Sequence, residues 1–168
     1  MNNTITIPAT IERKLFYDLN ISTALANCQK EGYTPMFMPQ LVDAKIQAPN
    51  ELPLWQNWLT TPSIRATGRT TQGIAVVIYA HIPNYFSNPE NITTAITQGL
   101  VNGAGKLPQE EFQRLVDLED KKRVFVIVGS DYNALKNSTS KFISTKYALK
   151  HPQTIPFLGG EERAEQYI

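Results

Sequence analysis

Two short apolar runs limit the folds that are open to this chain. Residues 74–80 read Ile-Ala-Val-Val-Ile-Tyr-Ala, and residues 124–128 read Val-Phe-Val-Ile-Val. Both are dominated by β-branched residues and do not alternate with polar residues, which is typical of strands buried on both faces. Neither run approaches the roughly 20 apolar residues that a membrane-spanning helix needs. We therefore expect a small sheet with covered central strands and no membrane span.

The residues between and around these runs predict how the strands are connected. Helix-start signals at residues 88–90 (Asn-Pro-Glu) and 108–111 (Pro-Gln-Glu-Glu) place two helices between the runs. A strand, two helices and a strand favour a right-handed crossover between parallel neighbours. Residues 63–70 alternate weakly before a turn and predict an antiparallel edge hairpin, and residues 154–158 predict a short edge strand. The expected fold class is α/β (or α+β), with a small mixed, mostly parallel sheet and helices packed on it.

The N-terminal third is expected to be helical. Apolar residues recur there at helical spacing after four helix-start signals, which are Thr10, either Asn20 or Ser22, Pro39 and Pro53. The length of 168 residues suits one domain. We expect residues 1–168 to form a single domain, with a helical portion at about 10–60 and a sheet-containing portion at about 63–168.

Composition excludes several classes of protein. Hydrophobic residues make up 42% of the chain, charged residues 18%, and the net charge is +1. This balance argues against disorder and gives no electrostatic reason to bind nucleic acid or an anionic membrane. One cysteine, Cys28, and no recognisable signal peptide predict a cytoplasmic protein. One cysteine and two histidines cannot supply a structural zinc site, so no metal or cofactor is expected.

Polar residues follow both apolar runs and form the candidate site. If the strands are parallel neighbours, their carboxyl ends meet at one edge, where ligands bind in open α/β sheets. His81 could then act as a general base oriented by Asp131. The expected ligand-binding residues are those that follow the two strands or could close over them: Asn84, Tyr85, Ser130, Asn133, Ser138 and Ser140.

Structural roles explain the same residues equally well. His81 can be a core histidine with a satisfied ring nitrogen, and residues 131–133 can form an ordinary Asx-type turn. Polar residues also gather at strand ends because backbone groups there need partners. The assignment of a site therefore depends on the two runs lying side by side in the same direction.

Other motifs are better explained by structure than by chemistry. The glycine-rich residues 99–105 precede Lys106, but five residues separate the first glycine from the Gly-Lys pair, one too many for a phosphate-binding loop. Gly159 and Gly160 precede two glutamates, whose charge would repel a phosphate. Cys28 falls on an apolar helical stripe and is expected in the core.

Three functions remain open. The first is a non-catalytic binding or interaction protein that assembles with itself or with a protein partner, since a low charged fraction favours a surface covered by another chain. The second is a small enzyme or nucleotide-type ligand binder working at the strand ends. The third is a nucleic-acid contact through Arg65 and Arg69, which the scattered distribution of the other basic residues argues against.

Overall fold

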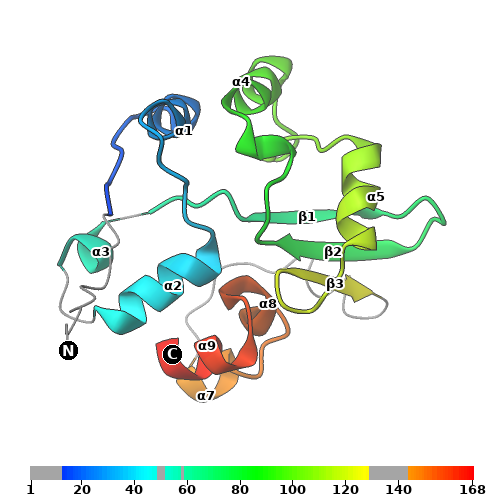
Figure 1. Cartoon of the computed structure of the whole chain (residues 1–168). Helices are drawn as coiled ribbons and strands as arrows, with labels where there is room; N and C mark the ends of the chain where they lie inside the picture. The colour runs from blue at the N-terminus through cyan, green and yellow to red at the C-terminus, as the bar shows by residue number, and fades with distance from the viewer. Residues whose placement is uncertain (1–12, 49–51, 58, 129–143) are drawn as a thin grey trace, which may run out of the picture.

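A computed structural model describes residues 13–48, 52–57, 59–128 and 144–168 of the chain. Its centre is a three-stranded sheet with helices on both faces (Figure 1). The strands lie in the order β1 (Ile64–Arg69), β2 (Ala75–Ala80) and β3 (Val124–Val128). The predicted hairpin is confirmed, because β1 pairs with β2 in antiparallel register from Arg69 opposite Ala75 to Ile64 opposite Ala80. Gly73, with a φ of 81°, lies in the turn between them.

The predicted parallel sheet is wrong, because β2 and β3 are antiparallel. Ala80 lies opposite Val124, and Val76 lies opposite Val128. The chain therefore enters β3 at the end where it left β2. A tight turn makes this possible: the Asp120 carboxylate accepts backbone N–H bonds from Lys122, Arg123 and Val124 beside that end of the sheet. An apolar run is buried on both faces in any central strand, so burial carried no information about direction.

The central strand β2 is buried on both faces, as the sequence predicts. On one face Val76 and Ile78 pack against Phe112 and Leu115 of α5 (Gln109–Asp117). This approach requires glycine in the neighbouring edge strand, because a Cβ at Gly68 would lie 2.9 Å from the Phe112 ring. The other face carries a smaller cluster formed by Val77, Tyr79 and Phe125.

Three of the four helices predicted in the N-terminal third are present: α1 (Ile21–Lys30), α2 (Met38–Gln47) and α3 (Leu52–Gln56). Asn20 caps α1 by accepting the Ser22 N–H. The helix predicted after Thr10 is wrong in its described part, since residues 13–18 adopt no regular structure.

Residues after β2 form a short 3-10 turn, η1 (Tyr85–Ser87), and then α4 (Pro89–Gln98), which starts at the predicted cap Asn88. In Figure 1, α4 stands above one end of the sheet, and α1 lies beside α4 over the segment that leads into β1; the two helices are in contact. Among the described helices, α5 is the one whose side chains pack in the core cluster on that face.

The C-terminal helices are α7 (Thr145–Ala148), α8 (Thr154–Leu158) and α9 (Glu161–Tyr167). They gather with α2 on the opposite side of the sheet from α4 (Figure 1). The edge strand predicted at residues 154–158 is wrong, because α8 is helical and Pro156 lies in its first turn, where no intrahelical N–H is needed. In the described part of the chain, no helix is long and apolar enough to cross a bilayer.

Candidate functional site

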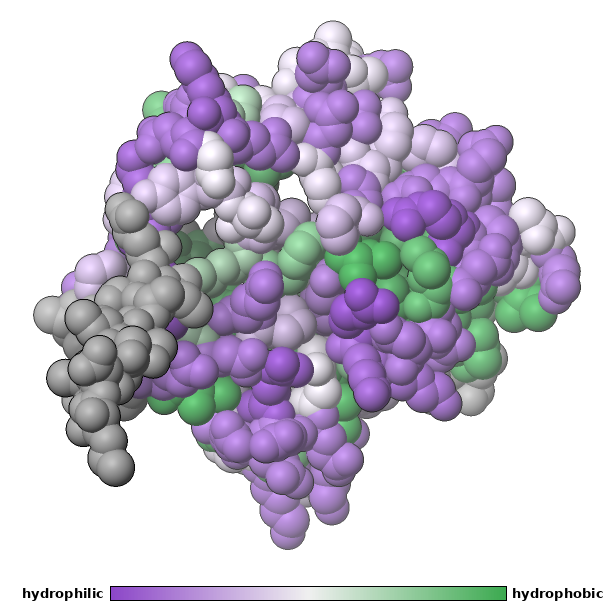
Figure 2. All heavy atoms as spheres, in the orientation of Figure 1, coloured by the Kyte–Doolittle hydropathy of each residue, from purple (hydrophilic) through white to green (hydrophobic). Residues whose placement is uncertain are grey.

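A large apolar cavity opens between α1, α4 and the segment that leads into β1, and we call it the α1–α4 pocket. It encloses about 660 Å³. Figure 2 shows this face of the molecule hollowed beneath α1. Most of its lining is apolar and includes Phe16, Leu25, Ile64, Phe86, Ile92 and Leu100.

The two helices that border this pocket bury little of their own apolar surface against the rest of the protein. Of the residues of α1, only Ser22 and Cys28 are buried, and α4 buries none. Ala24 of α1 and Ala95 of α4 line the cavity, and their small side chains leave it unfilled. Helices usually bury an apolar stripe against the core. Here the stripes of both helices face a hollow.

Aromatic rings form one wall of the pocket. Phe16 and Tyr33 pack edge to face with their centroids 5.6 Å apart. The Lys14 ammonium lies 5.1 Å from the Phe16 centroid and forms an ion pair with Glu31. Edge-to-face packing and a cation above the ring each add stabilisation to ordinary apolar contact. The wall is therefore held in place even though residues 13–18 form no helix.

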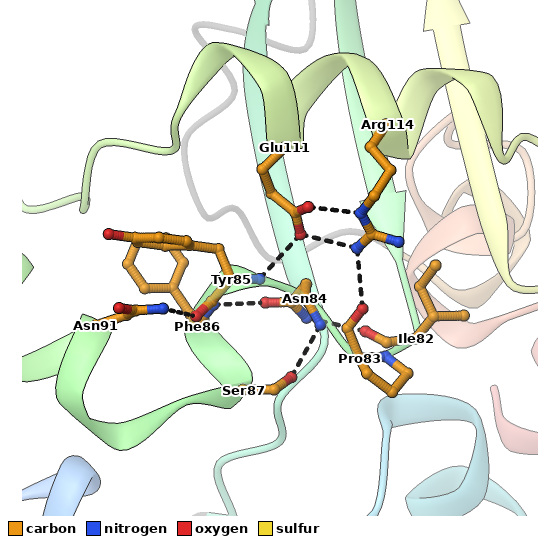
Figure 3. A network of polar contacts seen from close by, with 9 residues as sticks. All are labelled: Ile82, Pro83, Asn84, Tyr85, Phe86, Ser87, Asn91, Glu111 and Arg114. Atoms are coloured by element: carbon orange, nitrogen blue, oxygen red, sulfur yellow. Dashed lines mark hydrogen bonds and ion pairs between the residues drawn. The ribbon is translucent and has the colours of Figure 1, made fainter.

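A polar network holds Phe86 on the opposite wall, and Figure 3 shows it from close by. Asn84 caps η1, since its Oδ1 accepts the Phe86 N–H at 3.0 Å. Its Nδ2 donates to the carbonyl oxygens of Pro62, at 2.9 Å, and Ile82, at 3.0 Å. One buried side chain thus joins the turn that carries Phe86 to the segment that leads into β1.

A carboxylate on α5 completes this network (Figure 3). Glu111 Oε1 accepts the Tyr85 N–H at 2.9 Å, and Arg114 donates to both Glu111 oxygens, at 2.6 and 2.8 Å. Arg114 also donates to the Pro83 carbonyl at 3.1 Å. The Arg114 hydrogen bond lowers the pKa of Glu111 below its ordinary value, so the carboxylate remains an acceptor in mildly acidic solution.

Gly105 lets the loop after α4 close against the same wall. A Cβ at this position would lie 2.8 Å from Phe86 Cζ and 3.4 Å from the Ala95 Cβ. Only a residue without a side chain allows the backbone to approach the ring this closely. The position of Phe86 is therefore determined from two sides.

His81, the predicted general base, is buried at the end of β2 with both ring nitrogens engaged. Nε2 lies 2.8 Å from the Pro156 carbonyl, which can only accept, so Nε2 carries the proton. Nδ1 lies 2.9 Å from Ser63 Oγ, which also accepts the Met38 N–H and therefore gives its own proton to Nδ1. Burial lowers the pKa of His81, which favours this neutral form. The ring connects the start of β1 to α8 and leaves no nitrogen for a substrate.

The structure separates the other predicted site residues into two groups. Asn84 and Tyr85 lie in the η1 network just described. Asp131 and the predicted ligand residues of the second group, which are Ser130, Asn133, Ser138 and Ser140, lie outside the described residues. The prediction that both strands end at the same edge of the sheet is wrong. Because β3 ends opposite Val76, its last residue lies at the far end of β2 from His81.

The sequence did not predict a site at the pocket residues, because their apolar spacing is the same as that of residues that pack in a hydrophobic core. The apolar stripe at Ile92, Ala95, Ile96 and Leu100 is visible in the sequence, but sequence alone cannot show whether another element covers it. Within the described residues, no group of three or more His, Cys, Asp or Glu side chains is arranged to hold a metal.

The predicted nucleic-acid strand carries Arg65 and Arg69 on one exposed face. Both guanidinium groups bond within the protein: Arg65 donates to the Tyr79 hydroxyl at 3.1 Å, and Arg69 donates to the Gly73 carbonyl at 2.8 Å. The two side chains therefore support the hairpin.

Comparison with known proteins gives a clear relationship. Neither a protein-family model nor a curated protein matches the chain. A solved structure from work on the accommodation of massive sequence variation in Nanoarchaeota by the C-type lectin fold is similar, with a TM-score of 0.82 and 57% sequence identity. The match covers 92% of this chain and 70% of that one. The expected fold class, with a mostly parallel sheet, is therefore wrong: the similar structure has the C-type lectin fold, and the sheet of this chain is antiparallel. This chain therefore belongs to the same family of C-type lectin fold proteins.

Proposed function

We propose that this chain is a non-catalytic binding protein that holds an apolar part of its partner in the α1–α4 pocket. The observation that carries the proposal is the pocket itself, about 660 Å³ of largely apolar space left open by two helices. Ligand pockets generally fall between about 300 and 1,000 Å³ and are lined mainly by apolar and aromatic side chains. An apolar side chain that leaves water for such a site contributes roughly 1.5–3 kcal/mol.

The family relationship supports binding as the function. The related structure is described in terms of a fold that accommodates massive sequence variation. Such tolerance requires a core that keeps its structure while surface residues change, and binding functions commonly use surfaces carried on a rigid scaffold. The His81 ring, with both nitrogens bonded inside the protein, also favours a structural role over general-base catalysis.

Titration with N-phenyl-1-naphthylamine, an uncharged dye that fluoresces in apolar surroundings, tests the pocket. We expect saturable fluorescence enhancement with the wild-type chain. Ala24→Trp places a large side chain in the pocket and should weaken dye binding by at least about tenfold, a change of about 1.4 kcal/mol. Ala26→Trp is the matched control, because Ala26 is exposed on the same helix and does not line the pocket.

Two results would contradict the proposal. One is a wild-type chain that shows no saturable enhancement at low protein concentration. The other is an Ala24→Trp variant that binds the dye as tightly as the Ala26→Trp control. Far-UV circular dichroism of both variants checks that the helices remain folded.

A further inference from the structure

Exposed apolar side chains gather at the mouth of the α1–α4 pocket. Among the described residues, six large apolar residues from the stretches 17–21 and 96–101, which border the pocket, are exposed: Tyr17, Leu19, Ile21, Ile96, Leu100 and, directly after Leu100 in the chain, Val101. All but Val101 line the pocket. We call these six residues the mouth patch. The other exposed large apolar residues are spread over separate elements, such as Ile74 in the hairpin, Leu118 after α5 and Phe157 in α8.

From this patch we infer that the partner held at the pocket is a second copy of the same chain. The inference rests on the proposed function and names the partner for the same site. The two copies would meet through their mouth patches in an isologous contact, in which each copy presents the same surface to the other.

The size of the patch suits a dimer. The exposed fractions range from 109% for Leu19 to 42% for Ile21. Taken together, the six exposed fractions amount to about four fully exposed residues, or roughly 600 Å² of surface, most of it apolar. A stable interface buries about 800 Å² on each partner, and a polar rim normally supplies part of that area. The patch therefore provides much of what a dimer needs, and its area lies at the upper end of the roughly 300–600 Å² of the largest apolar patch on a typical monomer, which is often functional.

The charges around the patch favour a copy of the same chain over a strongly charged partner. Arg13, Lys14 and Asp18 are the charged residues in the pocket lining, and Lys14 is paired with Glu31. These four charges sum to zero, so two patches can approach without mutual repulsion. A polyanionic partner would find no compensating positive field here.

Sedimentation velocity of the full chain over a range of concentrations tests the inference. The wild type should move from 18.9 kDa toward twice that mass as its concentration rises. Leu19→Glu and Val101→Glu should each weaken dimerisation by about a hundredfold, since an isologous contact contains every substitution twice. Leu118→Glu is the control, because Leu118 is exposed after α5 and away from the patch, and it should leave the dimer intact.

The outcomes separate this inference from the proposed function. A wild type that remains at 18.9 kDa up to about 100 µM overturns the inference. So does equal dissociation of the dimer by the patch and control variants. If the monomeric chain still binds the dye in a manner that Ala24→Trp abolishes, the pocket is a binding site for a different partner, and only the identity of the partner is wrong. Two independent patch variants guard against the misfolding of either one.

Discussion

Replacing Asn84 by alanine should both destabilise the protein and disturb the pocket. Asn84 is 8% exposed, and its side chain makes three hydrogen bonds to backbone groups: it accepts from Phe86 and donates to Pro62 and Ile82. Loss of an N-cap costs about 1 kcal/mol, and a buried carbonyl left without its donor adds roughly 1–3 kcal/mol. We expect the free energy of unfolding to fall by about 2–4 kcal/mol, a large part of the 5–15 kcal/mol typical of a domain.

Urea unfolding followed by far-UV circular dichroism measures this change. Asn88→Ala is the matched control, because Asn88 is also an asparagine N-cap but is exposed and makes one such bond, to the Glu90 N–H. Its cost should be about 0.5–1 kcal/mol. If both variants lose the same small amount, Asn84 does not join η1 to the segment before β1. Asn84→Ala should also bind the naphthylamine dye less tightly, because Phe86 loses its support, whereas Asn88→Ala should bind it normally.

Three further predictions concern packing, charge and pH. Gly68→Ala should lower the free energy of unfolding by about 1–3 kcal/mol in calorimetry, because its Cβ would meet the Phe112 ring at 2.9 Å; unchanged stability would mean that the ring moves freely. Arg163→Met removes a two-pronged ion pair with Asp43, with N···O distances of 2.7 and 3.1 Å; since both side chains are more than a third exposed, it should cost about 1 kcal/mol or less in urea unfolding, and less again in high salt. Burial lowers the pKa of His81 below the ordinary histidine value of 6.5. As the pH falls, the unfolded chain therefore takes up this proton before the folded protein does. Stability should therefore fall as the pH drops from 7 toward 5, and His81→Gln should show a shallower fall in the same urea series; an identical slope would contradict the buried neutral ring.

The sequence was most informative where local hydrogen bonds determine the structure. Asn88 is an N-cap as predicted, Asn20 is the N-cap where the sequence left Asn20 and Ser22 open, and Gly32 follows α1 with the positive φ expected at a helix end. Helix caps depend on residues within one turn of each other, so a sequence pattern can reveal them. The hairpin between β1 and β2 was predictable for the same reason.

Features that depend on distant contacts were not predictable. The direction of β3 depends on where the chain returns to the sheet, and the turn at Asp120 that decides this resembles the end of a helix in the sequence. Residues 154–158 are too short for periodicity to separate a strand from a helix. The openness of the α1–α4 pocket depends on how far two helices stand from the sheet, and an apolar stripe looks the same whether it faces a core or a cavity.

Methyl-group nuclear magnetic resonance of the labelled chain during dye titration is the most direct measurement of where apolar molecules bind. The account predicts chemical-shift changes at the methyl groups of Leu25, Ile64 and Ile92, which line the pocket. Val77 and Ile127, on the face of the sheet away from α5, should not shift. Shifts that are centred on the sheet residues, or spread evenly over the molecule, would show that the α1–α4 pocket is not the binding site.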